Sequence, residues 1–64
     1  MKWVIQRQVI PGSSKGAQYW NGFSGFETNI SHACQYEFLN DCQTTLNKLV
    51  NEGWEDLSPI QVNL

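Results

Sequence analysis

The residues with the greatest capacity for chemistry are one histidine and two cysteines that lie close together in the sequence: His32, Cys34 and Cys42. Imidazole and thiolate are zinc ligands, and three of them would leave a fourth position open for a catalytic water. Their spacing lacks the paired pattern of known zinc motifs, and no third residue at a recognisable spacing would orient a His32–Cys34 nucleophile pair. We therefore expect no cofactor and two reduced, buried thiols. A zinc- or thiol-dependent enzyme that uses these three residues is the alternative.

A second stretch, residues 19–26, has the composition of a binding loop. Aromatic side chains act as rigid anchors in such loops, and Asn, Gly and Ser supply adaptable polar groups. An Asn-Gly pair favours a type I′ turn, so the stretch is either a small hairpin with its tip at residues 21–22 or an irregular loop. Burial of its rings in the core is the other interpretation. The residues that we expect to bind a partner are Tyr19, Trp20, Asn21, Gly22, Phe23 and Phe26.

The charges of the chain do not favour nucleic acid as the partner. The net charge is −2, and the first half of the chain holds only three scattered cations, at Lys2, Arg7 and Lys15. Nucleic-acid binders need clustered cations to displace counterions from phosphates. A weak single-stranded nucleic-acid binder, with Trp20 stacking on bases, is the alternative.

The length of the chain limits what it can bury. Its 64 residues form a single domain, residues 1–64, and a domain of this size buries only about 60% of its unfolded surface. Eight aromatic residues are more than one thin core can hide. We therefore expect a homodimer, in which pairing covers the second face of the sheet or the aromatic loop. No apolar run approaches the ~20 residues of a membrane span, and no signal peptide is visible, so we expect a cytoplasmic protein without membrane contact.

Three stretches have the alternating pattern of strands. Residues 2–10 place Trp3, Ile5 and Val9 on one face, before a turn over residues 11–16. Residues 33–38 alternate again, and an N-terminal extension of the following helix is the competing interpretation. Residues 58–64 alternate as well, and their proline indicates a strand start or an edge position.

The helix has the strongest pattern in the sequence. We expect it over residues 41–52, with Asn40 as its N-cap and Gly53 as the residue that ends it. Asp41 near its start and Lys48 near its end suit the helix dipole. One apolar stripe is expected to face the sheet: Leu39, Cys42, Leu46, Leu49 and Val50.

Two segments resemble a family of small uncharacterised domains found in bacterial and phage proteins. These segments are Lys2-Trp3-Val4-Ile5 and Leu46-Asn47-Lys48-Leu49-Val50-Asn51-Glu52-Gly53-Trp54. The hallmark of the family is a leucine-rich helix that ends in Glu-Gly-Trp before a strand. The resemblance implies a helix packed on a small antiparallel sheet, with no established activity and no catalytic residues to transfer.

Together these patterns predict an α+β domain. We expect a three- to four-stranded, mainly antiparallel sheet with one helix on one face. The expected function is a small non-enzymatic protein-interaction module, an adaptor or an inhibitor of a larger protein. We expect it to self-associate and to bind through its aromatic-rich loop.

Overall fold

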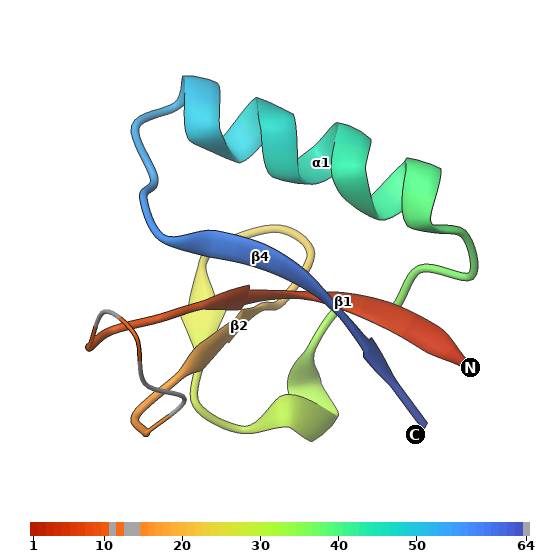
Figure 1. Cartoon of the computed structure of the whole chain (residues 1–64), viewed down its shortest axis with the longest axis horizontal. Coiled ribbons are helices and arrows are strands. Elements are labelled where there is room, and N and C mark those ends of the chain that lie inside the picture. Colours follow the sequence, from red (N-terminus) through yellow and green to blue (C-terminus); the bar gives the residue numbers. More distant parts are fainter. Residues whose placement is uncertain (11, 13–14, 64) are drawn as a thin grey trace.

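The sheet has four strands in the order β3–β2–β1–β4, and every neighbouring pair is antiparallel (Figure 1). The computed structural model describes residues 1–10, 12 and 15–63. The strands are β1 (Lys2–Arg7), β2 (Gln18–Trp20), β3 (Phe26–Glu27) and β4 (Leu57–Val62). The helices are a single 3₁₀ turn, η1 (Ile30–His32), and α1 (Leu39–Asn51). The predicted α+β class is therefore confirmed, with one helix against a four-stranded sheet.

The core lies between α1 and the central strand β1. Ile5 and Cys42 have no exposed surface, and Leu46 and Leu49 complete the buried cluster. Each of these residues comes from the apolar side of its own element, because strands alternate faces while helices repeat every three to four residues. Partly buried rings and one leucine surround the cluster: Trp3, Trp20, Phe26, Tyr36, Trp54 and Leu57.

The opposite face of β1 is covered by the chain itself. Val4 and Ile5 are neighbours on a strand, so their side chains point to opposite faces, and neither has any exposed surface. Figure 1 shows the segment that contains η1 on the side of the sheet away from α1. The expectation that a second protomer is needed to cover this face was therefore wrong for the centre of the sheet.

The first strand is shorter than predicted. It ends at Arg7, and Val9, predicted to continue the face of Trp3 and Ile5, is 48% exposed. The reason is the length of its neighbours, since Arg7 pairs with the first residues of both adjoining strands, Gln18 and Leu57. Beyond Arg7 the sheet offers no regular partner, and the pattern of apolar residues alone cannot reveal this.

Residues 33–38 form neither the predicted strand nor an extension of the helix. Only Tyr36 pairs with the sheet, through two backbone hydrogen bonds with Trp3 of 2.7 and 2.8 Å. The short strand β2 leaves this end of β1 unpaired on one side, and Tyr36 occupies one position there. The alternation of this segment therefore produces one bridge rather than a strand.

The helix begins earlier than expected, and its start has no side-chain cap. Phe38 is the N-cap residue, whereas Asn40, the predicted cap, lies inside the first turn, where its carbonyl accepts a hydrogen bond from Thr44 Oγ1 at 2.9 Å. Leu39 and Val50 are 44% and 49% exposed. The predicted apolar stripe is therefore correct for its three central residues and wrong at both ends.

The end of the helix follows the sequence prediction. Gly53 has φ +105°, its N–H donates to the Val50 carbonyl at 3.0 Å, and the Trp54 N–H donates to the Leu49 carbonyl at 3.1 Å. This is the Schellman arrangement, in which a residue of positive φ satisfies the last carbonyls of a helix. It also turns Trp54 back onto the core cluster that contains Leu49.

The C-terminal strand is confirmed as an edge strand that contains Pro59. Leu64 lies outside the described residues, as do Pro11, Ser13 and Ser14 of the predicted turn.

Replacing Gly53 with alanine should destabilise the protein, because an L-residue with a side chain is strained at this positive φ. We expect Gly53→Ala to lower the free energy of unfolding by about 1 kcal/mol. Gly25→Ala is the matched control, since Gly25 does not have a positive φ and a Cβ there meets no atom within 4 Å. Urea denaturation measures both, and equal effects of the two variants would contradict the assignment.

Candidate protein-interaction loop

Strands β2 and β3 form a hairpin that is joined by residues 21–25, here called the Asn21 loop. The Asn21 N–H donates to the Gly25 carbonyl at 2.9 Å and closes the loop, next to the Trp20–Phe26 strand pair. The predicted hairpin is therefore present, but the two-residue type I′ turn is not. That turn needs a positive φ at Asn21. Among the described residues other than glycine, only Asp56 has a positive φ, so Asn21 does not adopt this turn.

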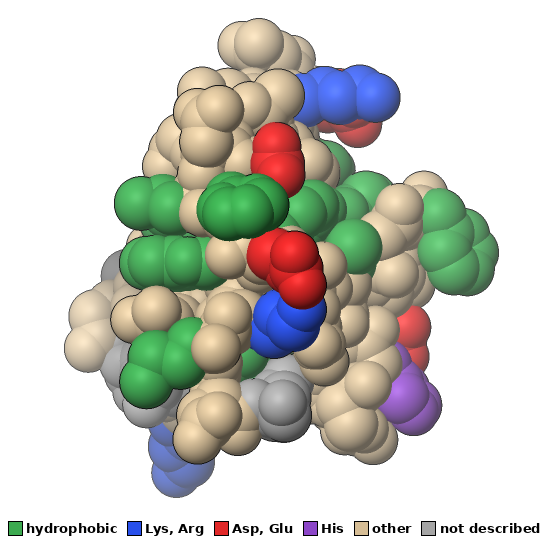
Figure 2. Space-filling model, turned by 90° about the vertical axis from the view of Figure 1, so that its right-hand side faces the viewer, with side chains coloured by type: hydrophobic (Ala, Val, Ile, Leu, Met, Phe, Trp, Pro, Cys, Tyr) green, Lys and Arg blue, Asp and Glu red, His purple; other side chains and the backbone are tan. Residues whose placement is uncertain are grey.

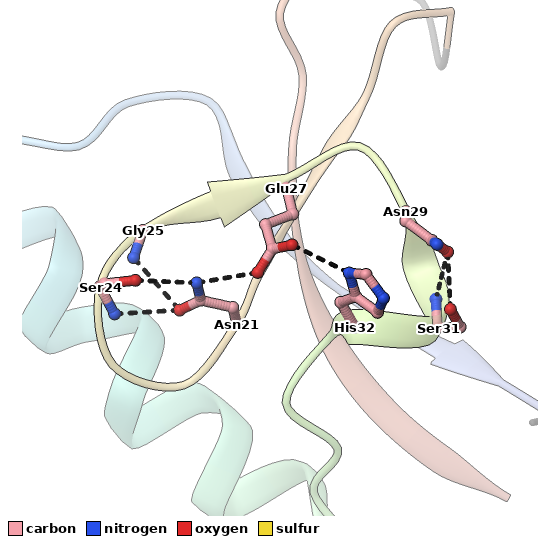
Figure 3. Close-up of polar contacts among 7 residues, drawn as sticks. All are labelled: Asn21, Ser24, Gly25, Glu27, Asn29, Ser31 and His32. Atoms are coloured by element: carbon pink, nitrogen blue, oxygen red, sulfur yellow. Dashed lines mark hydrogen bonds and ion pairs between the residues drawn. The ribbon is translucent and has the colours of Figure 1, made fainter.

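The side chain of Asn21 organises the backbone of its own loop (Figure 3). Its Oδ1 accepts hydrogen bonds from the backbone N–H groups of Phe23, Ser24 and Gly25 at 3.1, 3.0 and 3.2 Å. Its Nδ2 donates to Ser24 Oγ and to Glu27 Oε2, both at 3.0 Å. One amide side chain thus satisfies three backbone donors that the short strands leave without a ladder partner.

Gly22 is required in this loop for two reasons. Its φ of +101° lies in the region that other residues rarely adopt. In addition, a Cβ at this position would lie 3.2 Å from Cys34 Cβ and 3.3 Å from Cys34 Sγ. The loop therefore rests directly against the segment that follows η1.

A side-chain contact between Glu27 and His32 connects the hairpin to η1. His32 Nδ1 lies 3.0 Å from Glu27 Oε1, while the other carboxylate oxygen accepts from Asn21. The hydrogen bond from Asn21 and then the contact with His32 lower the pKa of Glu27 below its ordinary value of 4.5. The carboxylate thereby joins the side chain that organises the loop to a different segment of the chain.

The structure separates the aromatic residues that the sequence placed in one binding stretch. Phe23, at the tip of the Asn21 loop, is 84% exposed. Trp20 and Phe26 are partly buried against the core, with their ring centroids 5.5 Å apart. Tyr19 pairs with Gln6 across the strands and so lies on the face opposite its neighbour Trp20. Phe23 is therefore the ring of this stretch that is most available to a partner.

The partly buried rings continue beyond the hairpin. The Phe26 and Trp54 centroids are 4.9 Å apart, and the Arg7 guanidinium carbon lies 5.4 Å from the Trp54 ring centroid. This row of rings joins the hairpin to the end of the helix. The ring contacts thereby fix the base of the Asn21 loop on the core. Figure 2 shows that hydrophobic side chains also reach the surface at separate places on the face that contains the chain ends.

The three residues considered for metal or thiol chemistry have different surroundings. His32 contacts Glu27, Cys34 packs against Gly22, and Cys42 is fully buried in the core. Both cysteines are free thiols, and burial raises the pKa of Cys42. Among the residues that the structure describes, no three His, Cys, Asp or Glu side chains are grouped as a metal ion requires.

Two of the cations considered for nucleic-acid binding are held by other groups at opposite ends of β1. Lys2 Nζ lies 2.8 Å from Glu37 Oε1, and Arg7 donates to Gln18 Oε1 at 2.9 Å while it covers Trp54. The strand therefore separates these two charges rather than gathering them into one patch.

Glu27 and His32 were not predicted as parts of this site, and the role of the Asn21 side chain was not predicted either. A signal was present, because Asn side chains commonly accept hydrogen bonds from backbone groups two or more residues ahead. Glu27 and His32 gave no such signal, since the turn from β3 into η1 brings them together.

The part of the chain that the structure describes encloses no pocket, and it contains no helix with the length and apolar character to cross a bilayer. No protein-family model matches the sequence, and no match was found among curated proteins or solved structures. The family resemblance of the residue 46–54 segment therefore stays a prediction.

Removing the side chain of Asn21 should destabilise the loop. We expect Asn21→Ala to lower the free energy of unfolding by about 1–2 kcal/mol, because three backbone donors lose their acceptor. Asn29→Ala is the control: the Asn29 side chain accepts from the N–H and hydroxyl of Ser31 in an exposed turn, so the loss of one backbone donor's acceptor should have a smaller effect. Thermal unfolding measures both, and a larger loss in Asn29→Ala would contradict this account.

The ionisation of Glu27 should report on the same contacts. Both contacts favour the carboxylate, so the stability that Glu27 contributes is present above its unfolded-state pKa and is lost as the pH falls through the lower folded-state pKa. We expect an NMR titration of its carboxyl carbon to have a midpoint below 4.5, and we expect Asn21→Ala to raise that midpoint. A midpoint that does not respond to Asn21→Ala would show that the hydrogen bond does not form.

Proposed function

We propose that this protein is a small interaction module that binds another protein through the Asn21 loop, with Phe23 as the anchor. The observation that carries the proposal is the exposure of Phe23, 84%, on a loop whose backbone is fixed by Asn21. An exposed ring is costly in water and is worth most in a partner's pocket, where aromatic residues are common binding hot spots.

The order of the loop supports the proposal independently of its composition. A loop that is already fixed does not lose conformational freedom when it binds, so more of the contact energy appears as affinity. Five hydrogen bonds of Asn21, with Phe23, Ser24, Gly25 and Glu27, hold the backbone on both sides of the ring. Because the Phe23 ring projects into solvent, we expect the partner to supply a pocket for it.

Binding through side chains is also favoured because the sheet edges are poorly suited to strand addition. The Gln8 N–H donates to the Asp56 carbonyl, which shows which residues of β4 form hydrogen bonds with β1. In the observed register, the backbone groups of Leu57, Pro59 and Gln61 point away from β1, toward the open edge of the sheet. Pro59 has no N–H, so the middle of this edge lacks a donor. The other edge, β3, is only two residues long, and both features are typical of edges protected against pairing.

Self-association is the simplest form of this function, and we propose that Phe23 takes part in a homodimer. Binding to a larger protein, as an adaptor or an inhibitor, would use the same ring. Cys34 and Cys42 are free thiols, and free thiols persist in reducing compartments, so we place the protein in the cytoplasm.

The test is the replacement of Phe23 with alanine. Because the ring is exposed, we expect Phe23→Ala to fold with a change in stability within about 0.5 kcal/mol and to weaken association at least tenfold, which is about 1.4 kcal/mol. Sedimentation equilibrium at tens of micromolar measures the association, and a pull-down from host extract measures binding to other proteins.

Phe38→Ala is the matched control. Phe38 is also an exposed phenylalanine, at 66%, but it lies at the start of α1, away from the hairpin. If Phe38→Ala weakens association and Phe23→Ala does not, the interface lies at the start of the helix instead. If both variants behave as wild type in both assays, the proposal is wrong.

A further inference from the structure

We propose that Asn21 is a site of spontaneous deamidation, that the folded loop suppresses this reaction, and that the product disrupts the loop. The effect on binding rests on the proposed function, whereas the chemistry and the change in the loop do not. Asn21 is the only asparagine in the chain that a glycine follows. Glycine has no side chain to hinder its backbone nitrogen, and asparagine is among the thermolabile residues.

The reaction needs no cofactor and no other reactant than water. The backbone nitrogen of Gly22 attacks Cγ of Asn21, so an N–Cγ bond forms and the Cγ–Nδ2 bond breaks. Nδ2 leaves as ammonia with the proton that the Gly22 nitrogen gives up, and a cyclic imide remains. Water then opens the imide at either carbonyl, which yields aspartate or a β-linked isoaspartate.

The native loop opposes the first step. Oδ1 is directed toward the N–H groups of Phe23, Ser24 and Gly25, and Nδ2 is held by Ser24 Oγ and Glu27 Oε2. To turn Cγ toward the Gly22 nitrogen, the side chain must give up these bonds. The reaction therefore proceeds through opened loops, and its rate is reduced by the fraction of time that the loop is open.

The product cannot restore the native contacts. Nδ2 is a donor that lies 3.0 Å from Glu27 Oε2, and aspartate would place a second carboxylate oxygen there. Two carboxylates at this distance repel, so one must protonate or the side chains must separate. His32 contacts the other oxygen of Glu27, so it does not separate the two carboxylate oxygens that would face each other. Isoaspartate also adds a carbon to the backbone between the β2 strand and Gly22, which shifts the turn.

The first experiment compares deamidation in the folded and the unfolded protein. Wild type is held near pH 8, with and without denaturant, and peptide mass spectrometry follows ammonia loss and isoaspartate at each asparagine. We expect the reaction at Asn21 to be at least about tenfold slower in the folded protein. Equal rates, a faster reaction in the folded protein, or faster deamidation at another asparagine in the unfolded protein would overturn the proposal.

The second experiment tests the effect of the product with Asn21→Asp. We expect hydrogen exchange at the Phe23, Ser24 and Gly25 amides to speed up several-fold, and we expect the double variant N21D/E27Q to restore slow exchange, because the Gln amide replaces the lost donor. The control for charge alone is N21D/E37Q, because Glu37→Gln removes a carboxylate that is paired elsewhere, with Lys2. This double variant should not restore slow exchange. Exchange in Asn21→Asp at the wild-type rate, or no rescue by E27Q, would overturn the second part of the proposal.

The two proposals fail in different ways. If Phe23→Ala leaves association unchanged while Asn21 deamidates as described, only the proposed binding function is contradicted. Association that depends on Phe23 in a protein that shows no protection of Asn21 would contradict only the inference drawn here.

Discussion

The structure depends on how little interior a 64-residue chain can form. Val4, Ile5 and Cys42 are the only described residues with no exposed surface, and none of the eight aromatic side chains is fully buried. Most of the rings cover the margin of the core, where Trp20, Phe26 and Trp54 contact one another in a row. A domain with a larger core would place such rings inside. Here each ring keeps a surface that water or another molecule must cover.

The hairpin shows how a short chain obtains order without long strands. Strands of three and two residues provide few ladder hydrogen bonds, and the side chain of Asn21 supplies the acceptor that the loop backbone lacks. Glu27 then connects Asn21 to His32, so polar contacts position the loop while the rings anchor its base. The contacts of Asn21 that hold the backbone at Phe23 are also the ones that we propose to slow deamidation of Asn21. The proposed binding and the proposed chemical protection of this loop therefore rest on the same contacts.

Local features of the sequence predicted local features of the structure. The apolar period of Cys42, Leu46 and Leu49 located the helix, and Gly53 located its end, because both signals act within a few residues. The features that failed depend on distant partners. Val9 alternates as a strand residue would, but the adjoining strands do not extend to it, and Tyr36 finds one backbone partner where a strand was expected. The contact between Glu27 and His32 joins residues close in sequence, but it depends on how the chain turns from β3 into η1, which no spacing rule predicted.

The Asn21 loop is ordered while its aromatic tip stays in water. Backbone ¹⁵N relaxation of the wild-type protein measures this directly at the amides of Phe23, Ser24 and Gly25. The account predicts order parameters of about 0.85, equal to those of β1, as in a rigid backbone. Values below about 0.6 at these amides, with β1 still rigid, would show that the loop is flexible on the picosecond to nanosecond timescale. That result would contradict the claim that Asn21 holds Phe23 in place.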